Sequence, residues 1–102
     1  MTQSRGMTRE RQLVNWLRER GWFAMRSPAS KGPVDIVAVQ PGLVWFIEVK
    51  ATAKERGPYA GFPPADRQRL IEVAEKSGAV PMLIWWAPRC EPQMFPARLW
   101  PS

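Results

Sequence analysis

The order of predicted elements along the chain is helix, three strands, helix and strand, which indicates an α/β domain with a mixed β-sheet and helices packed on it. One observation is the stretch over residues 43–51, L-V-W-F-I-E-V-K-A, in which five apolar residues typical of a buried strand run into a charged pair. The other is the strand predicted over residues 34–39, which only a Gln-Pro-Gly connection separates from that stretch. Such a short connection predicts an antiparallel hairpin.

The first helix is predicted over residues 8–20, because Leu13, Val14 and Leu17 form one apolar stripe at helical spacing. Thr8 is placed to cap its first turn. The other predicted elements are strands over residues 22–26, 80–86 and about 95–100, and a second helix over residues 65–77.

A chain of 102 residues is long enough for one core, so residues 1–102 are predicted to form a single domain. Residues 1–7 are expected to be a flexible basic tail, and residues 88–102 a Pro-rich C-terminal tail. No stretch approaches the ~18 uninterrupted apolar residues of a membrane span, and the N-terminus lacks the apolar segment of a signal peptide. We therefore expect a cytoplasmic protein without a membrane partner, associated with nucleoid or viral DNA.

The charge and the rare residue types restrict the chemistry. A net charge of +6, from 15 Lys and Arg against 9 Asp and Glu, favours a polyanionic partner such as nucleic acid. The chain has no histidine, which excludes Ser-His and Cys-His catalysis. Cys90 is the only cysteine, so neither an intrachain disulfide nor a zinc-thiolate cluster is possible. Any metal must therefore be held by oxygen atoms, as Mg²⁺ or Mn²⁺ is.

Three carboxylates and one lysine are predicted to meet at one end of the hairpin. Glu48 and Lys50 point to the same face of their strand, because strand side chains alternate. Asp35 lies near the start of the preceding strand, and in an antiparallel pair that start lies beside the end of the next strand. Glu10 projects from the same helix face as the apolar stripe.

This cluster contains the groups that a phosphodiester hydrolase needs. Carboxylates that are close together repel one another, and a divalent cation relieves the repulsion while also binding phosphate. Lys50 could orient a water molecule or offset the charge that develops on the scissile phosphate. Two simpler interpretations stay open: Glu48 and Lys50 form an ordinary solvated pair at a strand end, and Glu10 only favours the positive end of its helix.

Five motifs in consistent order resemble the archaeal-type Holliday junction resolvases of the PD-(D/E)XK nuclease superfamily. They are Glu10, R-S-x-x-S over residues 26–30, V-D-I-V-A over 34–38, I-E-V-K over 47–50 and R-L-I-E over 69–72. The resemblance covers about residues 6–87 and implies a restriction-endonuclease-like core, with a mixed central sheet of about five strands flanked by helices. Here Val34 separates Pro33 from the aspartate, a departure from the superfamily's name that many resolvases share.

The resemblance also implies roles for individual residues. Glu10, Asp35 and Glu48 would bind Mg²⁺, for which Mn²⁺ can substitute, and Lys50 would be catalytic. Ser30 would lie near the scissile phosphate. The resemblance further implies DNA contacts at Arg11, Arg26 and Gln68. Three other basic residues could bind phosphates: Lys31, Lys54 and Arg56.

The function we expect is a Mg²⁺-dependent endodeoxyribonuclease that resolves four-way DNA junctions by paired symmetric cuts. The alternatives are another DNA repair or restriction-type nuclease of the same superfamily and a non-catalytic nucleic-acid-binding module. Two symmetric cuts favour a homodimer. The interface of this dimer is predicted to include apolar residues of the last strands: Met82, Trp85, Trp86 and Phe95, with Met94 nearby. The alternative is that Trp85 and Trp86 belong to the core.

Overall fold

The computed structural model describes residues 5–27 and 32–101 of the chain. This part forms helices α1 (Arg5–Glu19) and α2 (Pro64–Ser77), with two short 3₁₀ helices, η1 (Lys54–Arg56) and η2 (Ala97–Leu99). Its strands are β1 (Phe23–Arg26), β2 (Ile36–Gln40), β3 (Leu43–Lys50), β4 (Val80–Trp85) and β5 (Gln93–Pro96). Neither of its long helices is apolar enough to cross a membrane.

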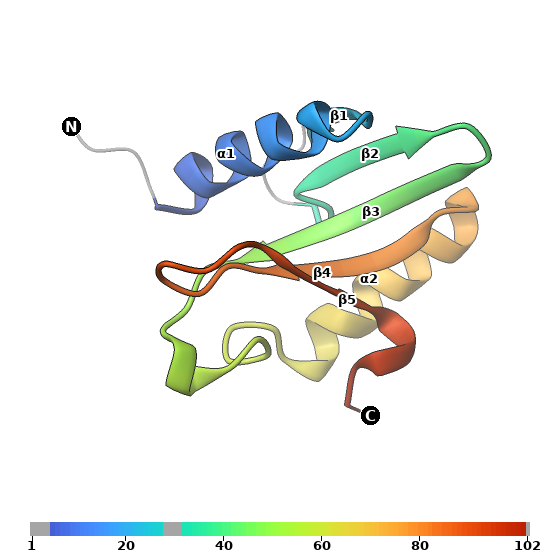
Figure 1. Cartoon of the computed structure of the whole chain (residues 1–102). Helices are drawn as coiled ribbons and strands as arrows, with labels where there is room; N and C mark the ends of the chain where they lie inside the picture. The colour runs from blue at the N-terminus through green and yellow to red at the C-terminus, as the bar shows by residue number, and fades with distance from the viewer. Residues whose placement is uncertain (1–4, 28–31, 102) are drawn as a thin grey trace.

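The strands form one mixed sheet in the order β1-β2-β3-β4-β5, which confirms the predicted fold class (Figure 1). β3 lies at the centre and pairs parallel with β4, whereas the other neighbours are antiparallel. The predicted hairpin of β2 and β3 is confirmed, with Ile36 opposite Ile47. Gly42 turns the chain between them with a φ of 74°, a backbone conformation that glycine adopts without steric cost.

The two long helices cover opposite faces of the sheet, α1 above it and α2 below it in Figure 1. Because strand side chains alternate, each face contributes its own apolar set. On the α1 face, Leu13 and Leu17 pack in one cluster with Ile36, Ile47 and other strand residues. On the α2 face, Leu70 packs with strand residues such as Leu83 and with the loop residue Phe62.

Both ends of the described chain are more regular than the sequence indicated. α1 begins at Arg5, so Thr8 lies inside the helix and is not its cap, and residues 5–7 do not belong to a flexible tail. Residues 1–4 lie outside the described residues. Most of the predicted Pro-rich tail is folded: β5 occupies residues 93–96, earlier than expected, and Trp100 packs its ring 5.0 Å from that of Phe62. That residues 1–102 form a single domain stays a prediction.

The structure contradicts the placement of Met82 and Trp85 at a dimer interface. Both side chains are buried in the chain itself, with exposed fractions of 4% and 7%. Met82 packs in the cluster beneath α1. Trp85 is covered because β5 pairs with β4 and places Phe95 6.3 Å from the Trp85 ring. Trp86 and Phe95 are partly buried, and their contact with a partner stays a prediction.

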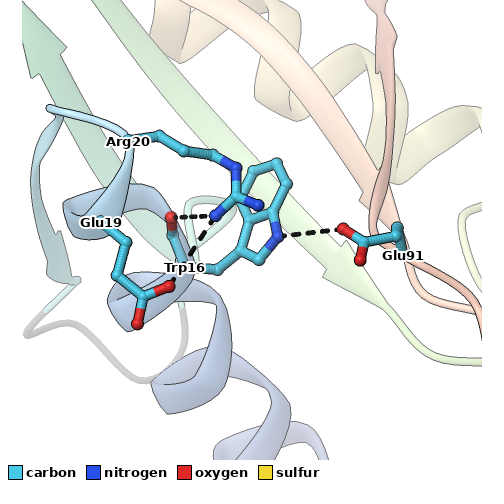
Figure 2. Close-up of polar contacts among 4 residues, drawn as sticks. All are labelled: Trp16, Glu19, Arg20 and Glu91. Atoms are coloured by element: carbon cyan, nitrogen blue, oxygen red, sulfur yellow. Dashed lines mark hydrogen bonds and ion pairs between the residues drawn. The ribbon is translucent and has the colours of Figure 1, made fainter.

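The loop between β4 and β5 is tied to α1 by the contacts that Figure 2 shows. The Trp16 indole N–H donates to a Glu91 carboxylate oxygen at 3.4 Å. The Arg20 guanidinium lies 3.7 Å from the centre of the Trp16 ring and donates to the Trp16 carbonyl at 3.0 Å. Of these contacts, the Trp16–Glu91 hydrogen bond links the loop to the helix, and Arg20 packs on the ring that makes it.

Candidate active site

The backbone of the hairpin places Asp35 beside Glu48. The Asp35 N–H donates to the Ile47 carbonyl at 2.8 Å, which extends the β2–β3 ladder by one residue. The Val49 N–H in turn donates to Asp35 Oδ2 at 2.9 Å. The aspartate side chain is thus fixed against β3, and the prediction that Asp35 meets the end of the next strand is confirmed.

Glu48 and Lys50 share one face of β3, as their spacing predicts. Lys50 Nζ lies 3.1 Å from Glu48 Oε2, with 27% of the lysine side chain and 15% of the glutamate side chain exposed. The pair therefore exists, but it is not the solvated strand-end pair of the simpler interpretation. A Cβ at Gly61 would lie 3.6 Å from Lys50 Cδ, so the loop before α2 limits the space around the lysine.

Asp35 and Glu48 open into a small pocket on the α2 side of the sheet. The pocket has a volume of about 140 Å³, and its walls come from the segment before β2, strand β3 and the first turns of α2. Its lining residues are Gly32, Pro33, Asp35, Glu48, Asp66 and Arg69. The pocket is large enough for a hydrated cation or a phosphate oxygen, but not for a larger ligand.

Burial makes both carboxylates poor acids in the absence of a cation. The pKa of Asp35 is raised to about 6, chiefly by burial; the charge of Glu10 contributes to the increase, while the Val49 N–H and Lys50 oppose it. Burial also raises the pKa of Glu48 to about 7, and the charges of Asp35 and Asp66 add to the effect while Lys50 opposes it. Two half-buried carboxylates that destabilise each other's charge are a donor set that fits a hard divalent cation.

Glu10 is held apart from this pair. Arg26 Nε donates to Glu10 Oε1 at 3.2 Å, and both residues lie on the side of the sheet that α1 covers. Glu10 is close enough to raise the pKa of Asp35, yet within residues 5–27 and 32–101 no three acidic, histidine or cysteine side chains gather closely enough to hold a metal ion. The structure therefore brings together two of the three predicted metal ligands.

The predicted DNA contacts have different surroundings. Arg11, Lys54 and Arg56 are exposed, whereas Arg26 is engaged with Glu10. Ser30 and Lys31 lie outside the described residues.

Gln68, an expected DNA contact, does not line the carboxylate pocket. Its amide donates to Glu72 at 3.2 Å on the exposed side of α2, and it lines a different hollow, with Ala97 and Trp100. The residues of α2 that face the site are Asp66 and Arg69, which the sequence analysis missed. Helical spacing could have found Asp66, which is four residues before the buried Leu70, whereas Gln68 is only two residues before it. Arg69 shares the side of Asp66 because it follows by three residues.

The raised pKa values predict that the site destabilises the fold at neutral pH. Because the folded state holds its protons more tightly than the unfolded state, stability is lost as pH rises from about 4 to 7. We expect Glu48→Gln, measured in EDTA, to raise the melting temperature at pH 8 by about 5 °C and to have little effect at pH 4. Glu75→Gln, which changes an exposed acid of α2, is the matched control. A Glu48→Gln effect of the same size at both pH values would contradict the account.

Comparisons with known proteins identify similar sequences and a similar fold. A family described as archaeal Holliday junction resolvase (Hjc) matches residues 1–100. A crossover junction endodeoxyribonuclease Hjc from Sulfurisphaera tokodaii is 37% identical over 80 residues, covering 74% of this chain and 54% of the relative. A UPF0102 protein from Rhodopseudomonas palustris is 37% identical over 71 residues, covering 68% and 55%. The chain thus spans about half the length of the curated relatives that it matches.

The solved structure of Archaeoglobus fulgidus Hjc, titled a Holliday junction resolvase from an archaeal hyperthermophile, superposes with a TM-score of 0.77. The sequences are 26% identical, and the match covers 93% of this chain and 75% of the other. The fold is therefore restriction-endonuclease-like, as the sequence motifs implied. The family match over nearly the whole chain, together with this shared fold, shows that the chain belongs to the archaeal Holliday junction resolvase (Hjc) family.

Proposed function

We propose that the chain is a divalent-cation-dependent endodeoxyribonuclease that cuts four-way DNA junctions. The observation that carries the proposal is the pocket in which Asp35 and Glu48 meet, with Lys50 3.1 Å from Glu48. A non-catalytic DNA-binding module gains nothing from two half-buried carboxylates, whose charge would repel phosphate. The family membership supports the junction as substrate, and the net charge of +6 supports DNA.

Asp35 and Glu48 would hold the cation, with Glu10 as a third ligand if it leaves Arg26. A bound Mg²⁺ would neutralise charge on the phosphate and lower the pKa of a water molecule. The chain's own contribution is to keep Asp35 fixed through the Val49 N–H and to present Lys50, partly exposed, as a donor to a phosphate oxygen or a water molecule. Arg69 at the pocket rim can bind a second phosphate oxygen, because a guanidinium presents several N–H groups.

The test is cleavage of a labelled four-way junction beside linear duplex of the same sequence, each with Mg²⁺ and with EDTA. We expect cleavage of the junction only, and only with the cation. Glu48→Gln in the same assay excludes a contaminating nuclease.

The second candidate is a nuclease of the same fold with another DNA substrate. The specific observation in its favour is the UPF0102 protein, which is as similar to this chain as the named junction endonuclease. Cleavage of linear duplex or of flapped DNA at the rate of the junction would favour this candidate and would leave the assignment of the pocket intact.

We further propose that the active form is a homodimer, and the structure suggests a different surface for it. Phe23 and Met25 on the edge strand β1 are 66% and 45% exposed. They lie opposite Val39 and Val37 of β2, so the four side chains form an apolar ladder on one face. Val37 follows Asp35 by two residues and shares its face of the sheet, because strand side chains alternate, so the ladder lies beside the candidate site.

If the ladder is the dimer interface, a charge placed on it should prevent dimer formation. Phe23→Glu should give a folded chain that sediments at the monomer mass and nicks junctions without paired cuts, because a buried charge opposes association. Leu99→Glu, which alters another exposed apolar side chain far along the sequence, is the control and should leave the dimer intact. If Phe23→Glu forms a dimer at the same protein concentration as the wild type, the ladder is not the dimer interface.

A further inference from the structure

A second and larger hollow lies near the candidate site, on the other side of the end of β3. It has a volume of about 560 Å³ and lies between the first turns of α1 and the segments that follow β3 and β4. We call it the Arg9–Trp86 groove; its lining residues are Thr8, Arg9, Gln12, Ala51, Thr52, Ala53, Trp86 and Pro88. A volume of this size accommodates a nucleoside, whereas the carboxylate pocket does not.

The Trp86 ring forms a fixed wall of this groove. Its indole N–H donates to the Cys90 carbonyl at 2.8 Å, and its backbone N–H donates to the Lys50 carbonyl at 2.8 Å. The loop that follows Trp86 is held against α1 by the contact between Trp16 and Glu91 (Figure 2). An aromatic ring whose orientation is set in advance loses little entropy when a flat ligand stacks on it.

Arg9 supplies a positive charge above this ring. Its guanidinium carbon lies 4.9 Å from the ring centre of Trp86, and its other contact is a long 3.4 Å hydrogen bond to Gln12. Among the described residues, no carboxylate lies within ion-pair distance of Arg9. A cation without a counter-ion, beside a rigid aromatic ring, is suited to the two parts of a nucleotide: the ring stacks on the base and the guanidinium binds the phosphate.

The groove is also placed where a substrate strand would continue. Its floor contains Ala51 to Ala53, the residues directly after Lys50, and the backbone of Trp86 is hydrogen-bonded to Lys50 itself. Consider a DNA strand with one phosphate at the carboxylate pocket. If this DNA strand continues around the end of β3, its next nucleotides enter the groove. A base that is paired inside a duplex cannot stack on a protein side chain, so the groove selects nucleotides that have left the stack.

We propose that the Arg9–Trp86 groove binds an unpaired nucleotide of the DNA substrate, whose base takes the place of the Arg9 guanidinium on the Trp86 ring and whose phosphate is bound by Arg9. This inference deepens the proposed function, on which it rests, because it gives the chain a means of preferring branched DNA, whose bases unstack easily at the branch point. The ligand class is an unpaired deoxynucleotide.

The experiment measures binding of a short oligothymidylate to the full chain in EDTA, by fluorescence anisotropy, so that cleavage plays no part. Arg9→Gln and Trp86→Ala should each weaken binding about tenfold, because the first removes a phosphate contact and the second removes the surface on which the base stacks. Trp86→Phe should bind within about threefold of the wild type, because it keeps an aromatic face. If Trp86→Ala does not fold, Arg9→Gln still carries the test.

The chain offers a matched control in Arg20 and Trp16, a second arginine over a tryptophan on the same helix but outside the groove (Figure 2). Arg20→Gln should bind oligothymidylate as the wild type does. If Arg9→Gln, Arg20→Gln and the wild type bind oligothymidylate with equal affinity, the groove is not a nucleotide site, whether or not the chain cleaves junctions. Conversely, loss of affinity in Arg9→Gln alone would support the groove even if the cleavage assay failed.

Discussion

Glu48→Gln and Asp35→Asn should each reduce junction cleavage by about a thousandfold or more, while junction affinity in EDTA stays within about threefold of the wild type. Each substitution removes one of the two carboxylates that line the pocket. A cation contributes several kcal/mol of charge stabilisation, and ~4 kcal/mol corresponds to about a thousandfold in rate. Affinity should persist because neither substitution alters the exposed basic residues.

Cleavage is measured on a gel under single-turnover conditions, and affinity by anisotropy of a labelled junction. Glu75→Gln, an exposed change on α2, is the control for general effects of removing an acid. Both site variants are expected to be well folded, since removing a half-buried charge stabilises the chain at neutral pH. Cleavage at the wild-type rate in either variant would show that the pocket is not the catalytic site.

Lys50→Met should lower the cleavage rate by about a hundredfold, the typical effect of removing one donor from a developing charge. It should also alter the pH dependence. Burial raises the pKa of Glu48 to about 7, and the charge of Lys50 opposes that increase. Without the lysine, the pKa of Glu48 rises further, and the acid limb of the cleavage profile moves to higher pH.

The measurement is the single-turnover rate between pH 5.5 and 9 at a fixed Mg²⁺ concentration. Lys50→Arg keeps the charge and changes the shape of the side chain. It should restore the position of the acid limb but only part of the rate, because a planar guanidinium does not reproduce the compact donor of an ammonium group. A Lys50→Met profile that overlays the wild-type profile would show that the lysine only pairs with Glu48.

The pairing of Asp35 with Glu48 could be predicted because it follows from local rules. Strand alternation places Glu48 and Lys50 on one face, and the short connection at Gly42 fixes the hairpin register that brings Asp35 alongside. These rules involve residues that are close in sequence, so no tertiary information is needed.

The contributions of α2 and β5 could not be predicted in the same way. Which side of α2 faces the pocket depends on how the helix packs on β3 and β4, and this packing selects Asp66 and Arg69 over Gln68. The burial of Trp85 depends on β5, a short strand ending in a proline, which sequence patterns place poorly. The ion pair of Glu10 with Arg26 depends on where α1 lies against β1.

The most direct test of junction resolution uses a supercoiled plasmid that extrudes a cruciform from an inverted repeat, beside the same plasmid without the repeat. A four-way junction forms only in the first plasmid, and paired cuts across it give linear DNA, whereas a single cut gives a nicked circle. With Mg²⁺, we expect the wild-type chain to convert the cruciform plasmid to linear product and to leave the other plasmid supercoiled. Equal nicking of both plasmids, or no cleavage of either with Mg²⁺ or Mn²⁺, would contradict the proposed function.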